Sequence, residues 1–178
     1  MKIVAFGASY SKQSINKKLA GFVAHQFENT DIEILDLNDY VLPVFSVDVE
    51  NETGHPEIIQ EFIKKLDSAD LIIISMAEHN GSYTAAFKNL FDWTSRVKLN
   101  MFENKKLLLL STSPGGRGAE SSLKTALERF PRHGATILNS YSLPNFHQNF
   151  DAEKGIVQEE KKAQLVELLN QIKSELLH

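Results

Sequence analysis

The sequence predicts a doubly wound α/β protein, with a five-stranded parallel sheet between two helical layers. One observation is a series of short apolar runs, each followed by a polar turn or loop, as is typical of strands buried on both faces. A second is that segments with the apolar spacing of helices lie between these runs. Because right-handed crossovers place helices on both faces, the ligand crevice is expected beyond the carboxyl ends of the strands.

The alternation assigns each element in order. The expected strands are Ile3–Phe6, Ile32–Leu37, Leu71–Ile74, Leu107–Leu110 and Thr136–Leu138. The expected helices carry apolar residues over Leu19–Phe27, Ile58–Leu66 and Ala86–Phe91, and continue with Ala119–Phe130 and Val157–Leu177. The longest expected loops are Val41–Pro56 and Leu143–Gly155.

Composition and charge narrow the class of protein. A chain of 178 residues and 20.0 kDa suits a single domain over residues 1–178, and 42% hydrophobic with 24% charged residues excludes disordered and fibrous classes. The net charge of -4, with both signs interspersed, argues against a nucleic-acid partner. The absence of Cys excludes disulfides and suits a reducing compartment, and no run reaches the ~20 apolar residues of a membrane span. We therefore expect a cytoplasmic protein without a membrane partner.

The loop after the first strand, Gly7–Asn16, is rich in hydroxyls and leads into a helix. First-turn amides lack helical partners and lie at the positive end of the helix dipole, which favours a phosphate beside donors such as Ser9, Ser11, Ser14 and the Asn16 amide. The alternative is a plain helix cap at Ser11 or Ser14. The glycine patterns of P-loops and dinucleotide-binding folds are absent.

The loop after the third strand contains Asn80-Gly81, which predicts a tight turn with outward amides. Such amides can hydrogen-bond the edge of a planar heterocycle, although a plain turn is the alternative. His79 is expected at the surface or packed against a ring, because no second His, Asp or Glu shares a metal-ligand spacing with it. Glu78 is alternatively a solvated loop carboxylate.

The loop after the fourth strand, Ser111–Gly118, has three glycines that permit close backbone approach. Ser113 lacks the G-x-S-x-G context of a hydrolase nucleophile. Arg117 would either neutralise a phosphate or form a surface ion pair.

Together, the three loops resemble those of the NADPH-dependent FMN reductase family, which is flavodoxin-like and includes quinone, chromate and azo-dye reductases. The family patterns are G-S-x-R-x-x-S-x-N, then P-E-Y-N-G-S followed by K-N-x-x-D-W, then S-x-S-P-G-G-x-G. The corresponding segments are Gly7–Asn16, Ala77–Ser82 with Lys88, Asn89, Asp92 and Trp93, and Ser111–Gly118. The resemblance spans most of the chain and implies a three-layer, flavodoxin-like fold.

The resemblance also implies FMN as cofactor and NAD(P)H as co-substrate, with hydride passing from nicotinamide to FMN and on to a quinone, free flavin or azo compound. No side chain need be a catalytic acid or base, and no metal is implied. The implied FMN-binding residues come from all three loops: Ser9, Ser11, Ser14, Ile15 and Asn16 at the phosphate, Ala77, Glu78, His79, Asn80 and Gly81 along the ring, and Ser113, Pro114, Gly115 and Gly116 on its other side.

The chain departs from the family pattern at three positions, with Ser11 for Arg, Ala77 for Pro and His79 for Tyr. The change at Ser11 removes a charge from the phosphate site, and the changes at Ala77 and His79 alter the surface on which the ring would lie. The family implies a homodimer or homotetramer, so Phe87, Phe91 and Trp93 would serve either a subunit interface or the core. A flavodoxin-like electron carrier and a flavin-free binding domain are the competing functions, although carriers are typically more acidic.

Overall fold

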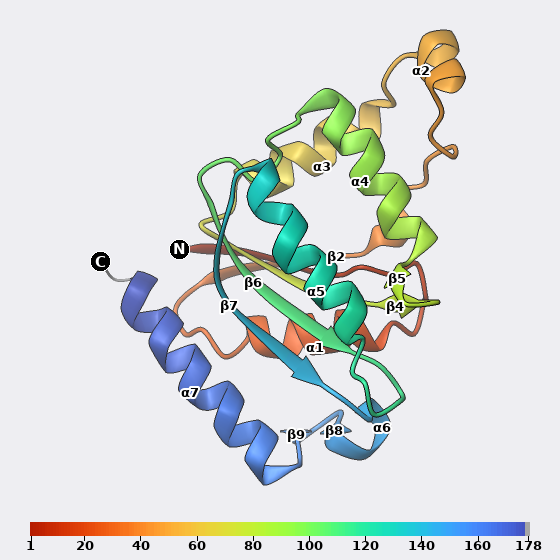
Figure 1. Cartoon of the computed structure of the whole chain (residues 1–178). Coiled ribbons are helices and arrows are strands. Elements are labelled where there is room, and N and C mark those ends of the chain that lie inside the picture. Colours follow the sequence, from red (N-terminus) through yellow and green to blue (C-terminus); the bar gives the residue numbers. More distant parts are fainter. Residues whose placement is uncertain (177–178) are drawn as a thin grey trace.

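The computed structural model describes residues 1–176 and contains a five-stranded parallel sheet in the order β2-β1-β3-β6-β7 (Figure 1). The strands are β1 (Lys2–Gly7), β2 (Asp31–Leu35), β3 (Leu71–Met76), β6 (Lys105–Thr112) and β7 (Ala135–Leu143). Strand β2 lies on one side of β1, whereas β3, β6 and β7 follow on the other side. The switch point of the strand order is therefore between β1 and its neighbour β3. This arrangement confirms the predicted doubly wound, flavodoxin-like class.

Helices cover both faces of the sheet, which gives three layers (Figure 1). On one face lie α1 (Ile15–Ala24) and α7 (Glu159–Leu176), and on the other lie α3 (Glu57–Asp67), α4 (Ala85–Val97) and α5 (Glu120–Arg129). Alternate strand residues enter the two cores: Phe6 packs with α3 and α4, whereas Ala5 packs with α1. Burial on both faces explains the uninterrupted apolar runs. The expected end of the last helix at Leu177 lies outside the described residues.

All five strands differ from their predicted ranges at one or both ends, and two of these differences have a clear local cause. The edge strand β7 continues to Leu143 instead of ending at Leu138, because its polar residues Asn139 and Ser140 still pair with β6. Conversely, β2 ends at Leu35, because the side chain of Asp36 accepts a 3.0 Å hydrogen bond from Asn38 N and caps the short 3-10 helix η1 (Leu37–Asp39).

The expected loop Val41–Pro56 contains a helix, α2 (Val47–Thr53), which stands apart from the sheet (Figure 1). Ser46 caps it by accepting a 3.1 Å hydrogen bond from Val49 N, and the helix ends at Gly54, which has a φ of 70°. The hydrophobic pattern missed α2 because none of its residues is buried.

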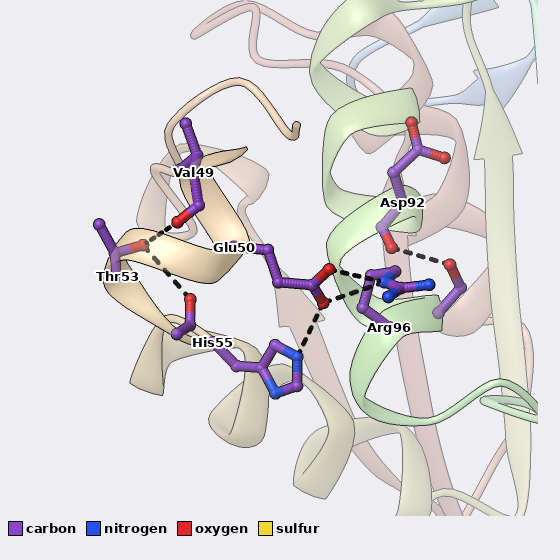
Figure 2. Close-up of polar contacts among 8 residues, drawn as sticks. Val49, Glu50, Thr53, His55, Asp92 and Arg96 are labelled. Carbon is purple, nitrogen blue, oxygen red and sulfur yellow. Dashed lines mark hydrogen bonds and ion pairs between the residues drawn. The ribbon is translucent and has the colours of Figure 1, made fainter. Parts of the chain in front are cut away.

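Helix α4 holds this segment in place through polar side chains. The Trp93 indole donates a 2.8 Å hydrogen bond to Pro43 O, and Asn89 Oδ1 accepts a 2.8 Å bond from Phe45 N. Figure 2 shows Arg96 donating from Nε to both carboxylate oxygens of Glu50, at 2.9 and 3.1 Å, while His55 Nε2 lies 3.0 Å from Glu50 Oε1. The segment is therefore anchored along α4.

The second expected loop, Leu143–Gly155, is also structured. It contains α6 (Phe146–Asn149) and the two-residue strands β8 (Phe150–Asp151) and β9 (Gly155–Ile156). Phe146 and Ile156 are buried in the core that contains α1 and α7. A second 3-10 helix, η2 (Phe130–His133), follows α5.

Phe87, Phe91 and Trp93 belong to the core, with exposures of 2%, 5% and 0%. All three side chains are buried in the same hydrophobic core cluster, so the interface interpretation of these rings is wrong. Within residues 1–176, no helix combines the length and apolar character needed to cross a bilayer.

Candidate cofactor site

The first site loop brings the N-terminus of α1 against the end of β1. Gly7 makes this approach possible, because a Cβ at this position would lie 2.3 Å from Lys17 N. Ser14 caps α1 by accepting a 3.1 Å hydrogen bond from Lys17 N. The amides of Ile15 and Asn16, in the first turn, have no acceptor within the helix and lie at its positive end. Ser14 therefore caps the helix, as the alternative interpretation expected, and the first-turn amides beside it have the arrangement that suits an anion.

The serine hydroxyls lie around this helix end. Ser9 Oγ accepts a 3.1 Å hydrogen bond from Ser11 N, and Ser14 N donates a 3.0 Å bond to Ser11 O. These bonds curl the loop above α1. Ser11 is exposed, whereas Ser14 is buried. The hydroxyl hydrogens of all three serines are free to donate to an anion.

Asn16 is 3% exposed, and its side chain is fixed by neighbouring strands. Its Oδ1 accepts hydrogen bonds from Ser75 Oγ (2.7 Å) and Thr112 N (3.1 Å), and its Nδ2 donates to Thr112 O (3.1 Å). One Nδ2–H remains beyond these bonds. The orientation of this amide is therefore set by the protein itself.

The second site loop forms a hairpin of β4 (Glu78–His79) and β5 (Ser82–Tyr83). Asn80 and Gly81 have positive φ values of 53° and 75°, as expected for the tight turn that the sequence predicts. Glu78 Oε2 accepts a 3.0 Å hydrogen bond from Ser122 N at the start of α5. Glu78 is thus a partner of a helix N-terminus and not a solvated carboxylate, whereas His79 is exposed.

The third site loop is held by the segment after β7. Ser113 O and Gly115 O accept hydrogen bonds of 3.0 Å from Phe146 N and Asn145 N. These bonds bring α6 and its His147 to the site. Arg117 donates a 3.1 Å bond to Ser121 Oγ, and among residues 1–176 it forms no ion pair, nor does it line the cavity between the three loops.

A cavity of about 240 Å³ joins the three loops at the carboxyl edge of the sheet. Ten of the fourteen sequence-predicted residues line it: Ser9, Ser11, Ser14, Ile15, Asn16, Ala77, Glu78, His79, Ser113 and Pro114. Asn80, Gly81, Gly115 and Gly116 lie in the adjoining turns and do not line it. A hollow of about 470 Å³ occurs beside Met1 and Phe27, at the opposite edge, away from the loops.

Three further residues line the cavity that the sequence reasoning missed: Gln13, Thr112 and His147. Gln13 and Thr112 are immediate neighbours of predicted residues, so extending the two motifs would have found them. His147 follows β7, the last strand of the five-stranded sheet. It could have been found from the rule that ligands of such folds bind beyond the carboxyl ends of the strands.

One charged group at the start of α1, Lys17, forms an ion pair with Asp36. Its hydrogen bond holds the pKa of that carboxyl at about 2. Lys17 is thereby directed to β2. Tyr10 donates a 2.8 Å hydrogen bond to Tyr40 O, and burial raises the pKa of its phenol. Over residues 1–176, no group of three or more His, Cys, Asp or Glu side chains is arranged to hold a metal ion.

These features define a flavodoxin-like protein whose α1 begins beside a cavity at the switch point of its sheet. The chain belongs to the NADPH-dependent FMN reductase family, whose model matches residues 1–148. The donor set fits FMN, because first-turn amides and hydroxyls suit a phosphate and the cavity joins them to two further loops.

Comparisons with individual proteins agree with this membership. The chain is 28% identical to an NADPH:quinone oxidoreductase of Arabidopsis thaliana, covering 95% of this chain and 88% of that protein. It is 23% identical to the NADH-dependent flavin reductase subunit 2 of Lactobacillus johnsonii, covering 94% and 92%. The structure of FerB, a flavoenzyme NAD(P)H:(acceptor) oxidoreductase from Paracoccus denitrificans, superposes with a TM-score of 0.73 at 21% identity, covering 97% of each chain. This last likeness supports the fold.

Proposed function

We propose that this chain is an FMN-dependent NAD(P)H oxidoreductase that binds one FMN in the cavity at the carboxyl edge of the sheet. Family membership supports the reaction class. The observation that carries the proposal is the convergence of three family-like loops on one cavity beside the first turn of α1. Residues 1–178 would act as one domain.

The phosphate would bind at α1. The amides of Ile15 and Asn16 would donate to it, with the hydroxyls of Ser9, Ser11 and Ser14 around it. These donors are neutral, so the helix dipole supplies the favourable electrostatic term. Gln13 lines the same part of the cavity and is a further candidate donor.

The ring would lie between the second and third loops. Ala77, Glu78 and His79 line the cavity. The adjoining Asn80-Gly81 turn would add backbone amides at the ring edge. Ser113, Pro114, Gly115 and Gly116 would close the other side. The positive φ of Gly81 places this turn, so a larger residue there would be strained.

FMN, when bound, supplies the chemistry by accepting a hydride and passing the electrons on. The chain's own residues would bind and orient it. No side chain in the cavity would have to move a proton. Glu78 is engaged with Ser122 N, and His79 and His147 are exposed to solvent. Orientation and the hydrogen bonds around the ring are the protein's contribution.

The electron acceptor would be a quinone or a free flavin, which the names of two relatives support, or an azo compound, as the resemblance of the three loops implies. We also propose a homodimer or homotetramer, for which the strongly exposed Val41, Val44 and Val47 offer apolar surface. The cytoplasm would be the compartment, since the chain lacks Cys and uses NAD(P)H. Light scattering and cell fractionation test these two statements.

Calorimetry with FMN and riboflavin tests the site directly. FMN should bind more tightly than riboflavin, because only FMN engages the helix N-terminus. The Ser14→Ala variant should lose FMN affinity, although its helix cap is lost as well; Ser46→Ala, which removes the equivalent cap of α2, is the matched control. Equal affinities for the two flavins in the wild type would contradict the phosphate site.

A further inference from the structure

Buried polar side chains gather at the site edge of the sheet, and Asn16 is their central member. Asn16, Ser75 and Thr112 have exposures of 3%, 0% and 1%, respectively. Buried polar groups of this kind are costly when unpaired and rigid when satisfied. The three bonds of the Asn16 amide therefore fix its position firmly.

These bonds connect separate loops of the site. Ser75 lies in β3, just before the second loop, and Thr112 ends β6, just before Ser113. Asn16 itself belongs to the first turn of α1, whose amides form the anion site. One side chain thus ties the phosphate end of the site to the strands that carry the other two loops.

Further bonds extend the connection on both sides. Ala8 N donates a 2.8 Å hydrogen bond to Ser75 O, and Thr84 Oγ1 donates a 2.8 Å bond to Ala8 O. At the other end, Thr112 Oγ1 donates a 2.6 Å bond to Leu143 O, at the end of β7. These hydrogen bonds hold segments that are distant in the sequence together at this edge of the sheet.

We propose that Asn16 is a positioning residue: through Ser75 and Thr112 it sets where the first-turn amides of α1 lie relative to the ring-binding loops. This inference rests on the proposed FMN site and deepens it. FMN has to engage both ends of the site at once, whereas riboflavin engages the ring end alone. Loosening Asn16 therefore lowers the affinity for FMN more than that for riboflavin.

Ser75 offers a test that leaves the cavity lining unchanged. Neither Ser75 nor Ser111 lines the cavity, and both are 0% exposed on neighbouring strands. Ser75 Oγ donates to Asn16, whereas Ser111 Oγ has no hydrogen-bond partner among residues 1–176. Ser75→Ala thus removes support from Asn16, and Ser111→Ala is its matched control.

The measurement is the ratio of the FMN to the riboflavin association constant, by calorimetry, for wild type, Ser75→Ala, Ser111→Ala and Ser75→Thr. We expect Ser75→Ala to lower this ratio about fivefold, within the ~3- to 10-fold that one buried hydrogen bond is worth. Ser111→Ala should leave it unchanged, and Ser75→Thr, which keeps the hydroxyl, should restore it. An unchanged ratio in Ser75→Ala overturns the proposal, and so does a loss of thermal stability without a change in the ratio.

Amide hydrogen exchange of the FMN-free protein separates this inference from the proposed function. The Thr112 amide donates to Asn16 Oδ1, so it should exchange faster in Ser75→Ala and at the wild-type rate in Ser111→Ala. Unaltered exchange overturns the positioning role. A wild-type protein that binds neither flavin overturns the proposed function, while the exchange rates still decide whether Ser75 orders the end of β6.

Discussion

The indole nitrogen of Trp93 donates a 2.8 Å hydrogen bond to the carbonyl oxygen of Pro43, which links α4 to the segment between β2 and α3. Trp93 is fully buried, and the ring of Phe45 packs edge-on against it with centroids 5.1 Å apart. Because this segment has few buried residues, its conformation depends on a small number of α4 side chains.

Replacing Trp93 with Phe should lower the free energy of unfolding by about 1 to 2 kcal/mol, through the lost hydrogen bond and part of the ring volume. It should also make residues 41–56 more sensitive to proteolysis. Thermal unfolding and limited proteolysis are the measurements. Ser95→Ala, on the same helix but bonded only within it, is the control. An unaltered cleavage pattern would refute the anchoring role of the indole.

Gly7 and Gly115 give opposite expectations for the same substitution. A Cβ at Gly7 would meet the backbone of α1 at 2.3 Å, whereas at Gly115 nothing lies within 4 Å. Gly7→Ala should therefore displace the N-terminus of α1 and cost about 3 kcal/mol in urea unfolding, the upper end for overpacked sites. Gly115→Ala should be close to neutral. Equal stability of the two variants would mean that α1 does not approach β1 as closely as described.

The ionisation of Asp36 makes the free energy of unfolding depend on pH. Its pKa is about 2 in the folded protein, chiefly because of the hydrogen bond from Lys17, and the unfolded value is about 3.9. The pair therefore stabilises the fold above about pH 4, and this contribution is lost as the pH falls towards 2. Both side chains are 32% exposed, so we expect at most about 1 kcal/mol.

The corresponding measurement is the unfolding free energy of wild type and Asp36→Asn between about pH 6 and pH 3. The wild type should be more stable near pH 6, and the difference should shrink towards pH 3. A difference that stays constant over this range would show that ionisation of Asp36 does not contribute.

Some elements of the fold could be predicted from the sequence, and others could not. The apolar runs that became β1, β3 and β6 were readable because burial on both faces leaves an uninterrupted pattern. Helix α2 could not be predicted from the hydrophobic pattern, because none of its residues is buried. Its caps, Ser46 and Gly54, are local, but the residues that anchor the segment, Asn89 and Trp93, lie on α4. The polar half of β7 was missed because an edge strand has no need of a continuous apolar run.

The candidate site likewise combines features that local motifs predict with features that depend on contacts between distant segments. Local motifs predicted the loops and the tight turn at Asn80-Gly81, which has the expected positive φ values. The bonds of Glu78 to Ser122 and of Asn16 to Ser75 join distant segments, so no local pattern reveals them. His147 reaches the cavity for the same reason, through the bond of Phe146 N to Ser113 O.

Ser11 stands where the family pattern has Arg, and it is exposed at the cavity. Ser11→Arg should tighten FMN binding about tenfold, the factor for ~1.4 kcal/mol, because a charge-assisted contact exceeds a neutral one. The gain should fall at high salt, since an ion pair is screened. Flavin fluorescence at low and high ionic strength measures this, with Lys12→Ala, expected to weaken binding only slightly, for comparison. A weaker or unaltered Ser11→Arg complex would place Ser11 away from the phosphate.

Oxidation of NAD(P)H through bound FMN can be followed by anaerobic stopped-flow absorbance of the FMN-loaded protein. Mixing with NADPH or NADH should bleach the flavin absorbance in a single turnover, and subsequent addition of a quinone should restore it. Steady-state initial rates should then give parallel double-reciprocal lines, because nicotinamide and acceptor use the same cavity in turn. A protein that retains its FMN but is bleached by neither nicotinamide would contradict this function and would indicate an electron carrier instead.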